Sequence, residues 1–178
     1  MPILKIDYED VNKLAKLFKE DYERRGLNFT QSSIKDYLKI GMKRKQFYAI
    51  EENNEIIGCV ALKPGYNFIL EMKDLIVRDE QQLRMLVENM IKICLEKEAR
   101  KLFTICPEKY ENGLERIGFI KEGMLKDHFW DGENLVIMSL KFVRKSDKQI
   151  NLKDKLEDIE ISRKAGEQLR KLPMNKQV

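Results

Sequence analysis

The sequence is poor in the residue types that build metal centres and disulfide frameworks. It has one histidine among 178 residues, and its three cysteines, Cys59, Cys94 and Cys106, lie far apart in apolar segments with no C-x-x-C pair. An odd number of such cysteines is typical of buried, reduced thiols in a cytosolic protein. We therefore expect reduced cysteines, no metal site and a cytoplasmic location.

Long apolar runs and a basic face are also missing. No run approaches the roughly 20 apolar residues that a membrane-spanning helix needs, and the N-terminal MPILKIDYED lacks a basic stretch followed by an apolar one. The formal net charge of +4 arises entirely from Arg144 onward, so the first 143 residues are balanced. We expect no membrane segment, no signal peptide and no nucleic-acid partner.

The hydrophobic pattern predicts a mixed α/β domain with helices on both faces of one sheet. The asparagines at 53 and 54 suit a hairpin turn with positive φ, and Gly132 marks a second hairpin. In chain order we expect a strand at 3–6, a helix ending at 26, a helix at 32–42, two strands within 46–64, a strand at 68–77, a helix from 80, a strand at 102–106, a short helix at 108–116 and a final hairpin at 119–142.

The segment from 83 to 95 has the clearest periodicity. Its apolar residues recur at helical spacing, and Asp79 with Gln82 has the spacing of a capping box, so we expect the helix to begin near Glu80. The strands on either side of this helix should then be parallel neighbours with a right-handed crossover. We expect them to splay apart toward their C-terminal ends, because Pro107 breaks continued pairing.

The last segment differs in composition. Residues 146–178 contain no aromatic residue and are dense in charge, with two weak apolar stripes and a stop at Pro173. We interpret the chain as a domain at 1–145 followed by an amphipathic helical extension at 146–178. The extension either packs back on its own domain or serves as an arm for a second copy or another protein.

The order of elements and several short strings resemble the GNAT family of acetyltransferases. IIGCVALKP is similar to the family's third strand, EMKDLIV to its fourth, RIGFIKEG to the GF-x-x-E-G after its last short helix, and MSLKF to its closing strand. The resemblance covers roughly residues 3–143. It implies the GNAT fold, an α/β domain with a central mixed sheet of about seven strands, and it implies acetyl-CoA as cosubstrate.

The family's cofactor motif, Gln/Arg-x-x-Gly-x-Gly/Ala, is incomplete. Its loop presents backbone N–H groups and a helix N-terminus to the pyrophosphate of coenzyme A. The resemblance places Gln82 at the first position, but Met85 and Val87 stand where the small residues belong.

The resemblance also assigns the other cofactor contacts. Main-chain groups around Ile76 and Val77 would hold the pantetheine arm. Arg78 and Arg84 could offset the acidic Asp79 and Glu80 by side-chain contacts to the phosphates. The alternative is a tight strand-to-helix turn that binds no ligand.

Candidate catalytic residues follow from the same resemblance. Glu71 matches the position where some members carry a catalytic glutamate, and a salt bridge at the cleft mouth is the alternative role. Asp74 is a second candidate, on the opposite face of the strand unless a bulge intervenes. The family's tyrosine acid corresponds to Leu114, which cannot do this chemistry. Tyr110 lies one helical turn earlier on roughly the same face and could substitute as the acid, and packing against a neighbour is its alternative role.

The final hairpin and the overall function leave alternatives open. His128, Phe129 and Trp130 either shape an acceptor site or form a solvent-facing ladder. The first functional interpretation is an N-acetyltransferase that moves an acetyl group from acetyl-CoA to a primary amine of unknown identity. The second is a catalytically silent GNAT-like domain that acts as a binding or interaction module.

Overall fold

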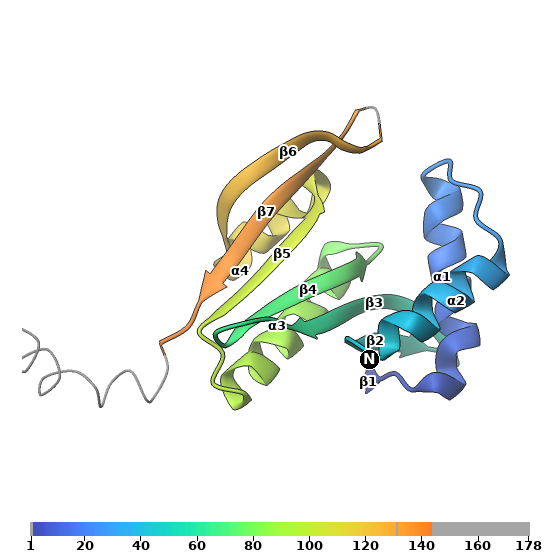
Figure 1. Ribbon diagram of the computed structural model, residues 1–178, viewed down its shortest axis with the longest axis horizontal. Helices are drawn as coiled ribbons and strands as arrows, with labels where there is room; N and C mark the ends of the chain where they lie inside the picture. The colour runs from blue at the N-terminus through green and yellow to red at the C-terminus, as the bar shows by residue number, and fades with distance from the viewer. Residues whose placement is uncertain (1, 131, 144–178) are drawn as a thin grey trace, which may run out of the picture. The chain divides into compact units, whose positions relative to one another are not determined.

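The described part of the computed structural model, residues 2–130 and 132–143, contains one seven-stranded mixed sheet in the order β1-β2-β3-β4-β5-β7-β6 (Figure 1). Among these described strands, β4 and β5 alone pair in parallel, and the other neighbours are antiparallel. The elements are β1 (Ile3–Lys5), η1 (Tyr8–Asp10), α1 (Val11–Arg24), α2 (Gln31–Met42), β2 (Gln46–Glu52), β3 (Glu55–Pro64), β4 (Ile69–Ile76), α3 (Glu80–Glu96), β5 (Lys101–Pro107), η2 (Glu108–Tyr110), α4 (Glu111–Ile117), β6 (Ile120–Trp130) and β7 (Glu133–Lys141).

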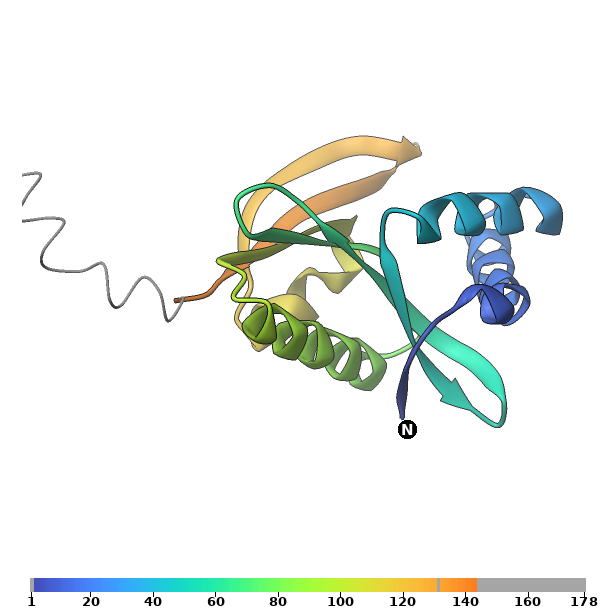
Figure 2. The same ribbon diagram turned by 60° about the horizontal axis from the view of Figure 1, so that its bottom comes forward.

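The two faces of the sheet bury separate cores. Alternation along β2 sends Phe47 and Ala49 to the face under α1 and α2, and it sends Ile50 to the face under α3 and α4. Figures 1 and 2 show the two helix pairs on opposite sides of the sheet. The predicted mixed sheet with helices on both faces is confirmed.

Local signals act as predicted at several turns. Asn53 and Asn54 adopt φ values of 50° and 63° between β2 and β3. The Asp79 side chain accepts a hydrogen bond from the Gln82 N–H and caps α3, which begins at Glu80. All three cysteines are buried free thiols.

The parallel pair β4–β5 diverges as predicted, although Pro107 does not start the divergence. Paired residues run from Ile69 with Lys101 to Met72 with Thr104, and within the described residues no later pair joins the two strands. From there β5 continues on β7 alone and β4 continues on β3 alone. The two strands thus separate before Pro107 is reached.

A β-bulge in β4 coincides with this separation. Lys73 pairs with Ala61 and Ile76 with Cys59, so Val60 alone on β3 stands opposite two residues of β4. One of these two, Asp74, has a φ of 49°, which is uncommon for a residue other than glycine. The extra residue shifts the side-chain alternation, and Asp74 therefore lies on the α1–α2 face instead of the opposite one.

The predicted extension at 146–178 lies outside the described residues. None of the described helices is long and apolar enough to cross a membrane.

Candidate functional site

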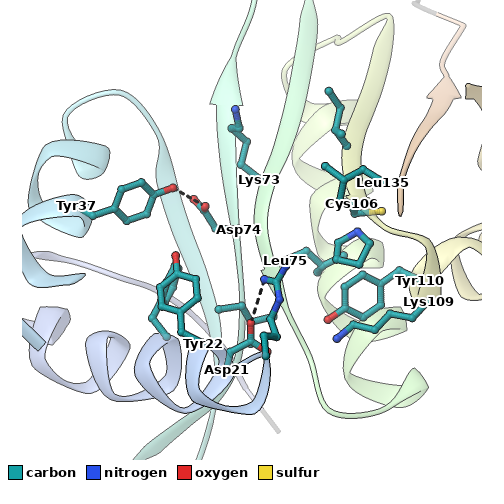
Figure 3. A pocket seen from close by; sticks show the side chains of 15 residues that line it. Asp21, Tyr22, Tyr37, Lys73, Asp74, Leu75, Cys106, Lys109, Tyr110 and Leu135 are labelled. Carbon is teal, nitrogen blue, oxygen red and sulfur yellow. Dashed lines mark hydrogen bonds and ion pairs between the residues drawn. The ribbon is translucent and has the colours of Figure 1, made fainter. Parts of the chain in front are cut away.

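A cleft of about 340 Å³ lies where β4 and β5 separate (Figure 3). The strand edges form its floor, α1 and α2 form one wall, and η2 with β7 forms the other. Its lining combines acids, bases and tyrosines with apolar groups. The residues are Phe18, Asp21, Tyr22, Arg25, Tyr37, Lys73, Asp74, Leu75, Ile76, Ile105, Cys106, Pro107, Lys109, Tyr110 and Leu135.

Asp74 is held at the α2 wall of the cleft by two partners. The Tyr37 hydroxyl donates to its carboxylate at 2.7 Å, and the Lys45 ammonium forms a close ion pair with it. The Lys45 side chain is 8% exposed and the Asp74 side chain 13%, so the pair is largely withdrawn from water. Burial, together with Asp74, raises the pKa of the Tyr37 phenol, which therefore remains a proton donor. The bulge thus delivers a carboxylate of fixed orientation into the cleft.

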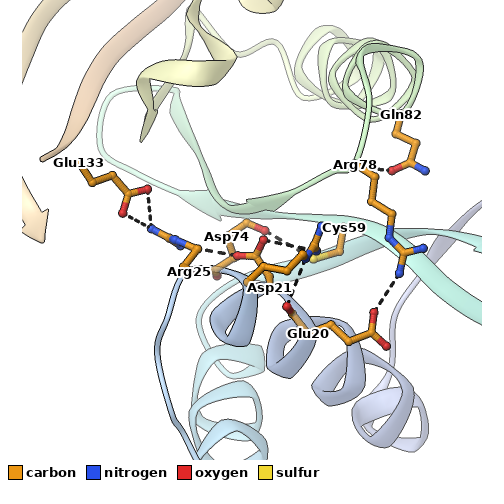
Figure 4. Close-up of polar contacts among 9 residues, drawn as sticks. Glu20, Asp21, Arg25, Cys59, Asp74, Arg78, Gln82 and Glu133 are labelled. Carbon is orange, nitrogen blue, oxygen red and sulfur yellow. Dashed lines mark hydrogen bonds and ion pairs between the residues drawn. The ribbon is translucent and has the colours of Figure 1, made fainter.

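An ion pair beside the cleft joins distant parts of the chain. Arg25, directly after α1, donates to both carboxylate oxygens of Glu133 on β7, at 2.8 and 2.7 Å (Figure 4). Asp21 lies 3.6 Å from the same guanidinium and is itself buried. This bidentate contact fixes the end of α1 relative to the final hairpin.

Tyr110 lines the opposite wall, as part of η2. Its side chain is buried, and burial raises the pKa of the phenol to about 12, while a hydrogen bond with the Val77 backbone acts in the opposite direction. The phenol keeps its proton at neutral pH. Leu114, the residue at the family's tyrosine position, is fully buried in the core of the α3–α4 face.

Glu71 lies outside the cleft. It is on β4 before the bulge, and it forms ion pairs with Lys63 at 3.5 Å and Lys73 at 3.3 Å. Glu71 is not among the described residues that line the cleft. The bulge nevertheless brings Asp74, the second candidate, to the same face of the sheet as Glu71, as we expected if a bulge intervened.

The turn between β4 and α3 uses its own side chains to satisfy its backbone. The Gln82 side-chain oxygen accepts the Arg78 N–H at 3.0 Å, and the Asp79 carboxylate accepts the Gln82 N–H at 2.8 Å. Gln82 is buried, and its oxygen lies against Gly58, where a Cβ would meet it at 3.2 Å. Two N–H groups that could face a pyrophosphate are therefore already occupied.

A second hollow, of about 410 Å³, lies at the start of α3. Four of its lining residues are cationic and come from four elements or turns: Arg24, Arg78, Lys109 and Arg116. Two acids, Asp79 and Glu80, also line it.

The cations of this hollow are partly engaged. Arg78 donates to Glu20 at 2.9 Å (Figure 4). Arg116 forms a close ion pair with Glu80. Arg84 points elsewhere, to Glu88 at 2.8 Å on its own helix. Sequence reasoning found Arg78 but missed the arginines of α1 and α4, which no local motif connects to this loop.

Of the three hairpin candidates, His128 has a side chain that the structure describes. His128 is exposed on β6, and it is not one of the described residues that line the cleft. The side chains of Phe129 and Trp130 lie outside what the structure describes.

Comparison with known proteins identifies the family. Residues 11–121 match the sequence profile of the Acetyltransferase (GNAT) family. No curated protein sequence matches the chain significantly.

Among solved structures, the fold is similar to several acetyltransferases. The aminoglycoside 6'-N-acetyltransferase from Enterococcus faecium is 13% identical, with a TM-score of 0.66 over 82% of this chain and 99% of that one. An aminoglycoside 6'-N-acetyltransferase complexed with coenzyme A is 14% identical, with the same TM-score of 0.66 and the same coverage of 82% and 99%. The ribosomal-protein-alanine N-acetyltransferase from Brucella melitensis is 16% identical, with a TM-score of 0.64 over 80% of this chain and all of that one. The profile match covers more than half of the sequence, and the chain therefore belongs to the GNAT acetyltransferase family.

Proposed function

We propose that this protein is an N-acetyltransferase that moves an acetyl group from acetyl-CoA to a primary amine. The observation that carries this proposal is the cleft formed where β4 leaves β5 after Met72. Main-chain groups on the edge of β4 that faces the cleft have no strand partner there within the described residues. An extended arm with amide groups can pair with such an edge as an added strand would.

In this proposal, two parts of the protein would hold the donor. Main-chain groups at Ile76 and Val77 would pair with the pantetheine amides. The cationic hollow at the start of α3 would receive the phosphates through side chains, chiefly Arg78, with Arg24, Lys109 and Arg116 around it. Gln82 contributes by fixing the turn rather than by facing a ligand. Arg84, bound to Glu88, is the weaker candidate.

Acetyl-CoA supplies the activated thioester, and the protein has to assist two proton transfers. The attacking ammonium has to lose a proton, and the Asp74 carboxylate, which lines the cleft, would accept it. The departing thiolate has to gain one, and Tyr110 lies on the wall where β5 ends. Glu71 is the alternative base, and the variant Glu71→Gln tests this role.

The acceptor side of the cleft is acidic and aromatic. Asp21, Tyr22, Tyr37 and Asp74 all line it. Carboxylates beside tyrosine rings attract an ammonium group and can hold it by hydrogen bonds and cation–π contact. This supports an amine as the acceptor class.

A binding module without catalysis is the second candidate. The occupied N–H groups of Arg78 and Gln82 favour it, and so does Leu114 at the position of the family's acid. In this alternative the cleft binds a small molecule and transfers nothing.

Thermal-shift titration separates the possibilities. A ligand that binds only the folded state at 100 times its Kd raises stability by about 2.7 kcal/mol. We expect acetyl-CoA and CoA to raise Tm, and pantetheine, which lacks the phosphates, to do so more weakly. Release of free thiol with a panel of primary amines then reports transfer. A shift without thiol release would support the binding module, and no shift with any of the three would remove the cofactor from the proposal.

A further inference from the structure

A third hollow, of about 410 Å³, lies away from the cleft, where α3 ends and β2 begins. It is bounded by the end of β1, the turn between α2 and β2, the adjoining ends of β3 and β4, and the residue that follows α3. The lining residues are Lys5, Met42, Arg44, Lys45, Gln46, Tyr48, Leu62, Pro64, Leu70 and Lys97. None of the elements of the cleft's η2–β7 wall contributes to it.

The base of this hollow is apolar. Leu62 and Leu70 are buried residues of the core on the α3 face, and Pro64 closes β3 beside them. Tyr48 is half-buried on the same face and adds a hydroxyl. Burial, with a contribution from Glu96, raises the pKa of the Tyr48 phenol, so this hydroxyl remains a donor.

The rim of the hollow is cationic. Lys5, Arg44 and Lys97 are exposed, and within the described residues none of the three has a carboxylate within ion-pair distance. Among the described residues, no acid is part of the lining. Most cations elsewhere on the described surface do have such partners. Like charges gathered at one hollow repel one another, and an anion placed among them removes that cost.

Lys45 contributes its aliphatic stem and not its charge. Its ammonium is engaged by Asp74 and lies 3.0 Å from the Tyr37 hydroxyl, on the cleft side. The charges at the rim are therefore those of Lys5, Arg44 and Lys97. Arg44 offers a planar fork that suits a carboxylate or a phosphate.

We propose that this hollow is a binding site for a small organic anion, with a carboxylate or phosphate group at the cationic rim and an apolar body on Leu62 and Leu70. Its volume is in the range of sites for small ligands. The site is separate from the cleft and does not depend on the acetyltransferase proposal.

The test uses the whole chain and simple probes. Benzoate and phenyl phosphate carry the two headgroups on one apolar ring, benzyl alcohol lacks the charge, and inorganic phosphate lacks the ring. We expect both aromatic anions to bind more tightly than benzyl alcohol and inorganic phosphate. Backbone amide shifts in NMR spectra should centre on Tyr48 and Leu70, with saturating acetyl-CoA present or absent.

Substitutions of the rim cations test which of them hold the anionic group of the probe. Arg44→Gln and Lys97→Gln should each weaken probe binding by at least about tenfold, the effect of one lost charge-assisted hydrogen bond. Lys92→Gln is the matched control, because Lys92 is an exposed lysine of α3 that lines none of the described hollows named above.

Four results would overturn the proposal. They are no binding at millimolar probe concentration, equal binding of benzyl alcohol, equal binding of inorganic phosphate, and shifts centred on Tyr110 that acetyl-CoA abolishes. The last would mean that the probe occupies the cleft. A failure of acetyl-CoA itself to bind would bear only on the proposed function.

Discussion

Replacing Asp74 by asparagine tests the ion pair that fixes the cleft carboxylate. The change removes the negative charge next to the Lys45 ammonium but keeps a side chain of similar shape. Removing one partner of a buried pair typically costs about 3–5 kcal/mol, because the other charge stays buried. Here the two side chains are 8% and 13% exposed, and the ammonium also lies over the rings of Tyr37 and Phe47, 4.5 and 5.0 Å from their centroids. These contacts persist, so we expect a loss of about 3 kcal/mol, at the lower end of that range.

A double-mutant cycle isolates this effect from catalysis. Lys45→Met removes the buried cation, so adding it to Asp74→Asn should restore part of the lost stability, with a coupling energy of about 2 kcal/mol. Urea unfolding monitored by circular dichroism measures all four proteins. If Asp74 is the base, thiol release should fall by about 100- to 10,000-fold in Asp74→Asn and stay low in the double variant.

Two results would refute this reasoning. Additive free energies of unfolding would mean that the pair contributes no coupling. Full activity in a stable double variant would mean that Asp74 accepts no proton. In that case Glu71→Gln becomes decisive: a strong fall in kcat with unchanged CoA affinity would give Glu71 the role that the family resemblance implies, despite its position outside the cleft.

Further tests address the opposite wall and the turn. Burial raises the pKa of the Tyr110 phenol in the folded protein to about 12, above its ordinary value of about 10, so its contribution to stability is complete below pH 10 and is lost as the pH rises toward 12. As the pH rises from 10 to 12, the free energy of unfolding of Tyr110→Phe, measured with urea, should therefore fall by about 2–3 kcal/mol less than that of the parent protein. Equal falls in the two proteins would contradict the burial of the phenol. Gln82→Ala leaves the Arg78 N–H without its acceptor and should lower the free energy of unfolding by about 1–3 kcal/mol; an unchanged urea midpoint would show that water replaces the carboxamide. In calorimetric titrations, Arg78→Ala should weaken CoA binding by about 1–3 kcal/mol. Arg84→Ala should leave CoA binding unchanged, because the Arg84 side chain is bound to Glu88. Weaker binding in Arg84→Ala alone would mean that Arg84, and not Arg78, contacts the phosphates.

The hydrophobic pattern was sufficient to predict the framework of the domain. The stripe from Leu83 to Leu95 and the cap at Asp79 depend on contacts within one or two helical turns, and α3 begins where they indicate. The parallel arrangement of β4 and β5 follows from this helix between them, because a crossover of that length is what parallel strands need. The odd, widely spaced cysteines likewise predicted buried free thiols.

The site was less accessible to sequence reasoning because its contacts join distant segments. Arg25 and Glu133 are separated by 108 positions and meet only when α1 and β7 flank the same cleft. The cationic rim at the end of α3 is another example: Lys5, Arg44 and Lys97 belong to three segments that are far apart in the sequence and line one hollow only in the folded chain.

By itself, the sequence determined which segments become helices and strands, the positive φ of the turn at Asn53 and Asn54, and that Met85 and Val87 stand where the family's cofactor motif has small residues. These are local properties, decided by side-chain periodicity and backbone preference within a few residues. Only the tertiary structure decided that Asp74, and not Glu71, reaches the cleft. The reason is physical: a bulge exists only relative to a partner strand, and Val60 of β3 opposing two residues of β4 changes the face on which every later side chain lies.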